Sequence, residues 1–312
     1  MHLVEVSAYP AEPDTEALVD FVRSVEADTG VRPLSDHLWV DLQRGGSAGS
    51  IVVRIADSQG TIGLAQISAA NQESALEVVV HVRKDAGDSA PAADVARDAA
   101  ETAIDAFQHA GGGELTIWVD DHDIGTTLAQ VGVANGMTLR RSLNEMRVAL
   151  PLTLQATVHT RAFVPGADDA PWLRVNNRAF ADHGEQGGWT LDTLALRQRE
   201  PWFDAKGFLI HDVEGQISAF CWTKIHAPEG AEPIGEIYVI AVDPQFHGHG
   251  LGKQLTLAGL DSMTARGVTT ATLFVDGDNT AALSLYLSLG FTTFRTRRAY
   301  GGRLHSTRQE YQ

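Results

Sequence analysis

The sequence predicts an α/β (α+β) chain of two similar domains, each a mixed, mostly antiparallel twisted sheet flanked by helices. The first observation is the length: 312 residues is about twice that of an average domain. The second is that apolar runs, turn residues and helical stretches follow the same order in each half. We place the boundary near Pro151, which gives predicted domains 1–150 and 151–312.

Two helical patches precede the β-rich runs of each half, at 14–28 and 35–43 in the first and at 168–183 and 190–199 in the second. Asp14 and Thr190 suit the N-cap position of their helices. Three β-rich runs joined by turn residues follow in each half, which is the pattern of a meander. They are SIVVRIAD, TIGLAQISAA and LEVVVHV in the first half, and GFLIHDVE, QISAFCWTKIH and GEIYVIAV in the second.

A helix, a strand, a second helix and a last strand complete each half. The first of these helices is predicted at 91–110 and at 250–266, and the strands after it are ELTIWVD and TATLFVD. Each second helix ends in a glycine and a bulky apolar residue, Gly136-Met137 and Gly290-Phe291. Both halves finish on a strand, so we expect two copies of one unit, alike in order and spacing more than in identity.

The composition, 44% apolar and 21% charged, is that of a globular chain. A net charge of −16 argues against a nucleic-acid partner but suits a cationic substrate such as a protonated amine. The one cysteine, Cys221, excludes an internal disulfide framework, and we expect it to be buried and inert. Neither a membrane span nor a secretory signal is evident, and a single cysteine fits a reducing cytosol, so we expect a cytoplasmic protein without a membrane partner. We also expect a monomer.

A glycine-rich loop lies in VDPQFHGHGLGKQL, residues 242–255, between an apolar strand and a helix. Backbone N–H groups and the helix dipole at such a junction favour an anion, above all a phosphate, and a Cβ would hold the phosphate away. The nucleotide P-loop pattern fails because Gln254 follows Gly252-Lys253, and the dinucleotide G-x-G-x-x-G spacing is absent. A glycine-rich turn without a ligand is the alternative.

This segment resembles the acetyl-CoA loop of the GNAT N-acetyltransferase superfamily. In both, a strand is followed by Val-Asp-Pro, then by the pattern x-x-x-Gly-x-Gly-x-Gly, and then by a helix. That family usually has Gln or Arg where this chain has His247, whose imidazole can also donate a hydrogen bond. The stretch LFVDGDNTAALSLYLSLGF, residues 273–291, resembles the last block of the family. In it Asn279 suits an N-cap, and Tyr286 lies two helical turns further along the same face. The first half lacks the glycine loop, and we expect it not to catalyse.

Four segments narrow the resemblance to the mycothiol synthase (mycothiol acetyltransferase) family, whose members have tandem GNAT domains. They are LRVNNRAFADHGEQGGWT, WFDAKGFLI, FCWTKIH and GEIYVIAVDP, in that order. The resemblance covers nearly the whole chain and is strongest over residues 171–291. It implies transfer of an acetyl group from acetyl-CoA to the cysteinyl amine of a cysteinyl-glucosaminyl-inositol, the last step of mycothiol biosynthesis.

At matching positions the resemblance implies that Glu236 is the general base and Tyr286 the general acid of a direct transfer in a ternary complex. Asp36, in place of the usual Glu, would reach over from the first half, and Phe274 lacks the hydroxyl of a tyrosine. The implied acceptor-binding residues are Asp36, Glu185, Lys224, Glu236 and Phe274. The implied cofactor-binding residues are Ile240, Ala241, Val242, His247, Gly248, His249, Gly250, Leu251, Gly252, Lys253, Asn279, Thr280, Ala281, Ala282, Leu283 and Ser284, with Val78, Val79 and Val80 as the counterpart strand.

Two other functions stay open on the sequence alone. One is acetylation of a different amine, such as an aminoglycoside or a protein N-terminus. The other is a non-catalytic module that binds acetyl-CoA, against which the Glu236 and Tyr286 pair argues. We expect no metal, because His247 and His249 have no further ligand at a suitable spacing.

Overall fold

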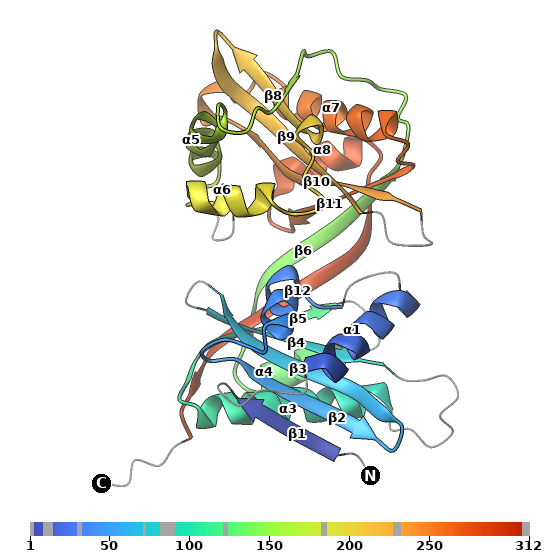
Figure 1. The fold of residues 1–312 in the computed structure, drawn as a ribbon, viewed down its shortest axis with the longest axis vertical. Helices are drawn as coiled ribbons and strands as arrows, with labels where there is room; N and C mark the ends of the chain where they lie inside the picture. The colour runs from blue at the N-terminus through green and yellow to red at the C-terminus, as the bar shows by residue number, and fades with distance from the viewer. Residues whose placement is uncertain are drawn as a thin grey trace. The chain divides into compact units, whose positions relative to one another are not determined.

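The computed structural model describes residues 3–8, 15–29, 33–70, 73–81, 91–120, 124–181, 186–226 and 232–307. The chain divides into two compact units: unit 1 comprises residues 1–143 and 295–312, and unit 2 residues 144–294. These units differ from the predicted domains 1–150 and 151–312 mainly in the C-terminal residues, which belong to unit 1 (Figure 1).

Unit 1 is a mixed sheet with helices on both faces. Its strands lie in the order β1-β2-β3-β4-β5-β12; β4 and β5 are parallel, whereas the pairs β1–β2, β2–β3, β3–β4 and β5–β12 are antiparallel. The elements are β1 (Leu3–Ala8), α1 (Thr15–Thr29), α2 (Asp36–Gln43), β2 (Ile51–Asp57), β3 (Gly60–Ala70), β4 (Glu73–Val80), α3 (Ala92–His109), β5 (Gly112–Asp120), α4 (Gly125–Ala134) and β12 (Thr292–His305).

Side-chain alternation along the strands gives unit 1 two cores. Helices α1 and α2 pack on one face of the sheet, through Leu18 and Leu38 against Leu64. Helices α3 and α4 cover the other face with an alanine-rich surface. Gly63 lets α3 come close, because a Cβ there would lie 2.6 Å from a methyl carbon of Val95. Both faces of this sheet are therefore buried.

Unit 2 repeats the arrangement, with strands in the order β6-β11-β10-β9-β8-β7. Strands β10 and β11 are parallel, and the pairs β7–β8, β8–β9 and β9–β10 are antiparallel. The elements are β6 (Thr138–Ala149), β7 (Arg161–Ala162), α5 (Asp169–Ala179), α6 (Leu191–Gln198), the 3-10 turn η1 (Ala205–Gly207), β8 (Phe208–Val213), β9 (Gln216–His226), β10 (Ile234–Val242), the 3-10 turn η2 (Pro244–Phe246), α7 (Leu251–Ala265), β11 (Thr270–Asp276) and α8 (Thr280–Ser288).

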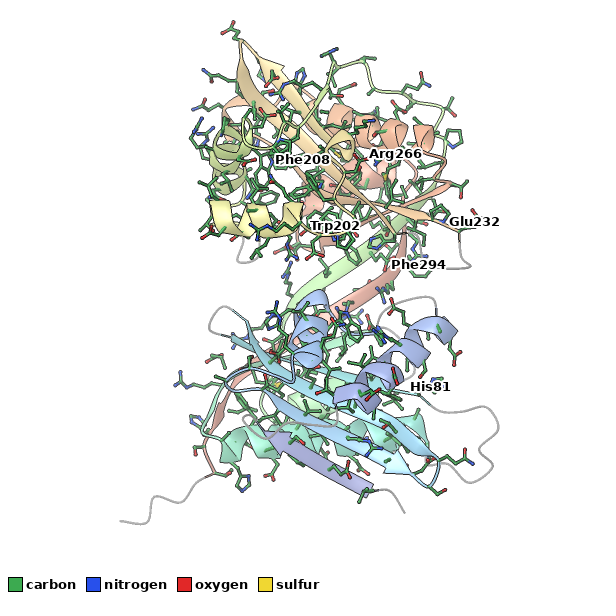
Figure 2. All side chains as sticks on the ribbon, in the orientation of Figure 1. His81, Trp202, Phe208, Glu232, Arg266 and Phe294 are labelled. Carbon is green, nitrogen blue, oxygen red and sulfur yellow. The ribbon has the colours of Figure 1, made fainter. Side chains whose placement is uncertain are left out.

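Aromatic rings fill the face of the unit 2 sheet that carries α5 and α6. Phe208 stacks on Trp222 with 4.4 Å between ring centroids, and Trp172 meets both rings edge-on. Figure 2 shows Phe208 within this layer, and the half-buried Trp202 at its edge. Helices α7 and α8 cover the other face, where Cys221 is fully buried as predicted. Burial raises the pKa of the Cys221 thiol to about 12, so the thiol is inert at neutral pH.

Most predicted helices agree with the structure within one or two residues. Helix α5 ends at Ala179, before the predicted end at residue 183, and residues 182–185 lie outside the described part. Thr190 caps α6 as predicted, because its hydroxyl accepts a hydrogen bond from the N–H of Thr193. The predicted cap Asp14 lies outside the described residues. Across the described ranges, no helix is both long and apolar enough to span a membrane.

The last strand of each half of the chain is not confined to the unit that the rest of that half forms. Residues 138–143 of β6 belong to unit 1, and residues 144–149 of the same strand belong to unit 2. Strand β12, at the end of the chain, pairs with β5 of unit 1, from Arg297 opposite Asp120 to His305 opposite Gly112. The chain therefore passes between the units twice, once in β6 and once in β12.

Candidate active site

Strands β10 and β11 of unit 2 run side by side only over their first residues. Their paired residues extend from Ile234 with Thr270 to Ile237 with Leu273. Beyond that point β10 remains paired with β9 on its other edge, up to Val242 opposite Ala219. The β9–β10 register shifts between Ile237 and Val239, so Tyr238 is the extra residue of a bulge. The predicted cofactor residues 240–242 thus lie just past the point where the two parallel strands part.

The glycine loop connects the end of β10 to α7. Gly248 and Gly250 have φ values of +83° and +73°, which non-glycine residues seldom adopt, and Gly250 is the N-cap of α7. No atom lies within 4 Å of where a Cβ would stand on either glycine, and no side chain caps the helix. The loop therefore presents bare backbone at the positive end of a 15-residue helix.

Both histidines of the loop are bonded to its backbone. The Nε2 atom of His247 lies 3.0 Å from the carbonyl oxygen of Val242, and the Nδ1 atom of His249 lies 3.3 Å from that of Phe246. Since a carbonyl oxygen only accepts, each ring donates there, and its other nitrogen stays available. Within the described residues no three His, Cys, Asp or Glu side chains gather as a metal site would require.

Asp243 fixes the start of this loop. It is 1% exposed, its backbone N–H donates to the carbonyl oxygen of Ser218 (2.8 Å), and its carboxylate accepts from the N–H of Gln245 (3.1 Å). Arg178 of α5 donates a second, charge-assisted hydrogen bond to the same carboxylate. The Val-Asp-Pro turn therefore has a structural cause: a buried acid ties the loop to β9 and to α5.

Helix α8 holds the predicted general acid. Asn279 caps the helix as predicted, since its side-chain oxygen accepts from the N–H of Ala282 (3.1 Å). Tyr286 is 7% exposed and packs on Phe291 with 5.7 Å between ring centroids. Burial, and to a lesser extent the neighbouring Cys221, raises the pKa of the phenol above its ordinary value. Tyr286 is therefore protonated at neutral pH and able to donate its proton.

Glu236 lies on the paired part of β10, opposite Lys224 of β9 and Thr272 of β11. It is 8% exposed, and its Oε2 lies 2.5 Å from Nε2 of His226. The Lys224 ammonium stands 4.8 Å from the ring centroid of Trp202 and 5.8 Å from that of Tyr238. A buried carboxylate and a lysine held over two rings thus occupy adjacent strands.

The other predicted acceptor residues are less well defined. Phe274 is on β11, past the last residue paired with β10, and its side chain is 42% exposed. Asp36 is the first residue of α2, but its side chain lies outside the described part of the chain. Glu185 falls outside the described residues altogether. Their roles stay predictions.

In unit 1 the two parallel strands also part, but the residues at that point differ from those of unit 2. Strand β4 pairs with β5 only from Ser74 with Leu115 to Leu76 with Ile117, so the predicted segment 78–80 also lies past the parting. Leu76 thus corresponds to Ile237, and the residue corresponding to Glu236 is Ala75. Glu77, which resembles Glu236 in the sequence, stands where unit 2 has Tyr238.

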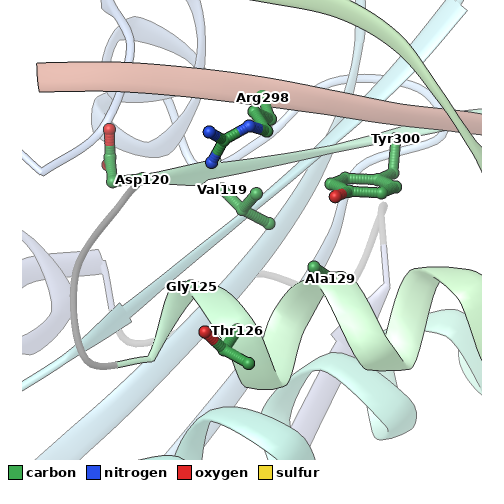
Figure 3. A pocket seen from close by; sticks show the side chains of 7 residues that line it. All are labelled: Val119, Asp120, Gly125, Thr126, Ala129, Arg298 and Tyr300. Atoms are coloured by element: carbon green, nitrogen blue, oxygen red, sulfur yellow. The ribbon is translucent and has the colours of Figure 1, made fainter.

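One described cavity lies in unit 1, away from these residues. It has a volume of about 340 Å³ and is bounded by β5, β12 and the start of α4 (Figure 3). Its lining residues are Val119, Asp120, Gly125, Thr126, Ala129, Arg298 and Tyr300. Because none of these is a predicted site residue, the cavity gives no support to the predicted cofactor segment of unit 1.

Comparison with known proteins agrees with this geometry. The profile of the Acetyltransferase (GNAT) family matches residues 174–291. The mycothiol acetyltransferase of Thermobispora bispora is 39% identical, over 93% of this chain and 95% of the relative. The chain belongs to the mycothiol acetyltransferase family. The mycothiol acetyltransferase of Acidimicrobium ferrooxidans is 36% identical over 93% of this chain and 94% of its own. The resemblance stated from the sequence is thereby confirmed, and the protein is an N-acetyltransferase.

Solved structures confirm the fold predicted for a mycothiol acetyltransferase, two tandem GNAT-like domains. A GCN5-related N-acetyltransferase from Sphaerobacter thermophilus superposes with a TM-score of 0.68, over 97% of this chain and 96% of that chain, at 16% identity. A tandem GNAT protein from the clavulanic acid biosynthesis pathway superposes with a TM-score of 0.60, over 97% and 98%, also at 16% identity.

His226 is a site residue that the sequence analysis did not single out. It follows Lys224 by two positions, so both side chains are on the same face of the sheet as Glu236. The stretch FCWTKIH contains it, but only the register between β9 and β10 shows that its ring reaches the carboxylate.

Proposed function

We propose that the protein transfers the acetyl group of acetyl-CoA to the cysteinyl amine of cysteinyl-glucosaminyl-inositol and so makes mycothiol. The observation that carries the proposal is one strand, β10, with a buried carboxylate before the parting from β11 and a bare glycine loop at its end. Homology to mycothiol acetyltransferases over 93% of the chain supports this acceptor. We also place the reaction in the cytoplasm, on the ground of the single cysteine.

Three segments of unit 2 would hold acetyl-CoA. The backbone of residues 247–253, at the positive end of α7, is suited to the pyrophosphate. The free edge of residues 240–242 is suited to amide groups of the pantetheine arm. Residues 279–284, at the start of α8, complete the site near Tyr286. The cofactor supplies an acetyl thioester, and the protein supplies its position.

The mechanism is a direct attack of the amine on the thioester. The Glu236 carboxylate removes a proton from the ammonium of the acceptor, which frees the nitrogen lone pair. Backbone N–H groups near residues 240–242 polarise the thioester carbonyl while the C–N bond forms and the C–S bond breaks. Tyr286 gives its proton to the departing sulfur, the attacking nitrogen releases its second proton to solvent, and solvent returns a proton to Tyr286. The products are an amide and the free thiol of CoA. Lys224 and Phe274 would contact the acceptor beside Glu236.

Unit 1 is proposed to be non-catalytic. The residue corresponding to Glu236 is Ala75, which has no proton acceptor. Glu77 is two residues further on, and its two oxygens already accept hydrogen bonds from the N–H of Ser35 (2.7 Å) and from Arg297 (2.9 Å). Both oxygens of Glu77 are thus turned toward donors of the protein itself rather than toward a substrate.

The acceptor is tested by steady-state assays with acetyl-CoA and a panel of amines. The panel includes cysteinyl-glucosaminyl-inositol, glucosaminyl-inositol, free cysteine, an aminoglycoside and a short peptide. Because the acceptor carries a thiol, the product is followed by mass spectrometry, and its thiol is titrated to separate N-acetylation from S-acetylation. We expect a kcat/KM for the first compound that exceeds the others by at least about a hundredfold, the scale on which a site discriminates through polar contacts.

Glu236→Gln is the control in the same assay. It keeps the shape of the side chain and should lower kcat by a hundredfold or more, on the scale of general-base catalysis, with an unchanged Kd for acetyl-CoA. A preference for another amine would contradict the proposed acceptor but would leave the acetyltransferase activity in place. Binding of acetyl-CoA without turnover of any amine would reduce the protein to a binding module.

A further inference from the structure

Glu236 and His226 form a hydrogen-bonded pair across two antiparallel strands of unit 2. His226 is opposite Ile234 on β10, so it is a diagonal neighbour of Glu236 on the same face of the sheet. Its Nε2 lies 2.5 Å from Oε2 of the carboxylate. Since an ionised carboxylate only accepts, the Nε2–H of His226 donates. Among the described residues, His226 is the one side chain that hydrogen-bonds Glu236.

The two partners differ in their access to water. The Glu236 side chain is 11% exposed, and the His226 side chain is 41% exposed. A buried carboxylate without a hydrogen-bond donor would be costly. The His226 N–H satisfies one oxygen of the carboxylate and fixes its orientation. The other oxygen, Oε1, remains to accept a proton from a substrate.

Other charged groups around this pair are already engaged or lie further out. Lys224, opposite Glu236, faces the rings of Trp202 and Tyr238. On β6, Glu145 accepts hydrogen bonds from Arg147 (2.8 Å) and from Thr272. Thr272 is on β11, so this strand lies between Glu145 and Glu236. On α5, Arg178 is paired with Asp243. Glu232 precedes β10 and is exposed. Helix α7 packs on the opposite face, with Met263 against Gly235.

We propose that His226 is a positioning residue for the general base. Its Nε2–H holds Oε2 of Glu236, fixes the orientation of the carboxylate, and leaves Oε1 for the proton of the acceptor amine. The inference rests on the proposed function in taking Glu236 as the base. It adds a residue outside the set that the family resemblance implies.

The test compares kcat and KM for the wild type, His226→Leu and His226→Gln. Leucine removes the donor, so the carboxylate is no longer held toward the acceptor amine, and kcat should fall roughly tenfold with an unchanged KM for acetyl-CoA. Glutamine retains an N–H and should restore a large part of kcat. The Kd for acetyl-CoA should not change in either variant.

A matched control is His211→Leu, on β8 of the same sheet, whose Nδ1 bonds only to the backbone oxygen of His159. It should leave kcat unchanged. The proposal is overturned if His226→Leu keeps the kcat of the wild type, or if His226→Gln loses as much of kcat as His226→Leu, because a role in packing alone would not be rescued by an N–H donor.

A second measurement separates this inference from the proposed function. NMR of the His226 ring in the wild type and in Glu236→Gln needs no turnover. The hydrogen bond to a carboxylate is charge-assisted, so the resonance of the Nε2–H proton should move to higher field in Glu236→Gln. This shift in an enzyme that acetylates no tested amine would keep the pair and refute the function. Identical ring spectra in an active enzyme would refute the pair and keep the function.

Discussion

Arg297 donates a hydrogen bond from Nη2 to Oε1 of Glu77 over 2.9 Å, between residues 220 positions apart in the chain. Both side chains are largely buried in unit 1, at 18% and 3% exposure, and Asp120 lies 3.2 Å from the same guanidinium. Burial alone would lower the pKa of Arg297, but the two carboxylates hold it above its ordinary value. This ion pair ties the last strand of the chain to β4 of the N-terminal sheet.

The first prediction is that Arg297→Leu destabilises unit 1. It leaves Glu77 and Asp120 without their counter-charge, and breaking a buried pair costs about 3 kcal/mol or more. Urea unfolding monitored by circular dichroism should show a lower midpoint. Arg303→Leu is the control on the same strand, since that side chain is 72% exposed and 4.0 Å from Glu114. Equal midpoints for the two variants would refute a structural role for the buried pair.

The sequence could not predict this pairing. Both final strands, in TLRRSLNEMRVAL and TTFRTRRAYGG, have the same local pattern, and nothing local states which sheet each one joins. Glu77 and Glu236 also look alike locally, because each follows a short apolar start of a strand. The register with the next parallel strand nevertheless places them two positions apart.

Features set by neighbouring residues were predicted well. Gly250 at the start of α7, the Asn279 cap and the Thr190 cap each depend on a few residues along the chain. His226 was not singled out, because its relation to Glu236 exists only after β9 and β10 pair. Non-local strand register is thus the part of this site that the sequence does not reveal.

The second prediction concerns the glycine at the start of α7. Gly250→Ala should weaken acetyl-CoA binding at least tenfold, because a Cβ would meet the phosphate and the left-handed backbone is strained. Gly267→Ala is a matched control at the other end of α7, with φ +79° against +73° and likewise no atom within 4 Å. Both should lose about 1 kcal/mol of stability. Calorimetry should find a raised Kd for acetyl-CoA only in Gly250→Ala. Equal Kd values for the two variants would contradict the phosphate site.

The third prediction is that Tyr286→Phe lowers kcat by about a hundredfold without weakening acetyl-CoA binding, on the scale of general-acid catalysis. Because burial raises the pKa of the phenol, the proton stays on Tyr286 throughout the neutral and mildly alkaline range. The kcat profile of the wild type should therefore show no loss from Tyr286 ionisation up to about pH 10, the ordinary value for tyrosine. A Tyr286→Phe variant with wild-type kcat would remove the residue from the mechanism.

The fourth prediction is an acid dependence of stability from Asp168. Its carboxylate accepts from Arg161 Nη1 (2.6 Å) and from the N–H of Val164 (2.7 Å), just before α5. Burial alone would raise the pKa of Asp168, but these two donors lower it below the ordinary 3.8. A depressed pKa contributes stability above the ordinary value, and this contribution is lost as the pH falls through the folded-state value.

Asp168→Asn should therefore reduce the free energy of unfolding by about 1–2 kcal/mol at neutral pH, a discounted figure because Arg161 is about a third exposed. The difference from the wild type should stay constant down to about pH 4 and shrink below it, because there the wild-type carboxyl also becomes neutral. Thermal melts across this range measure it, with the exposed Asp192→Asn as the control that should change little. A difference that grows as the pH falls would show that the aspartate is stabilised in its neutral form, contrary to the geometry of its two donors.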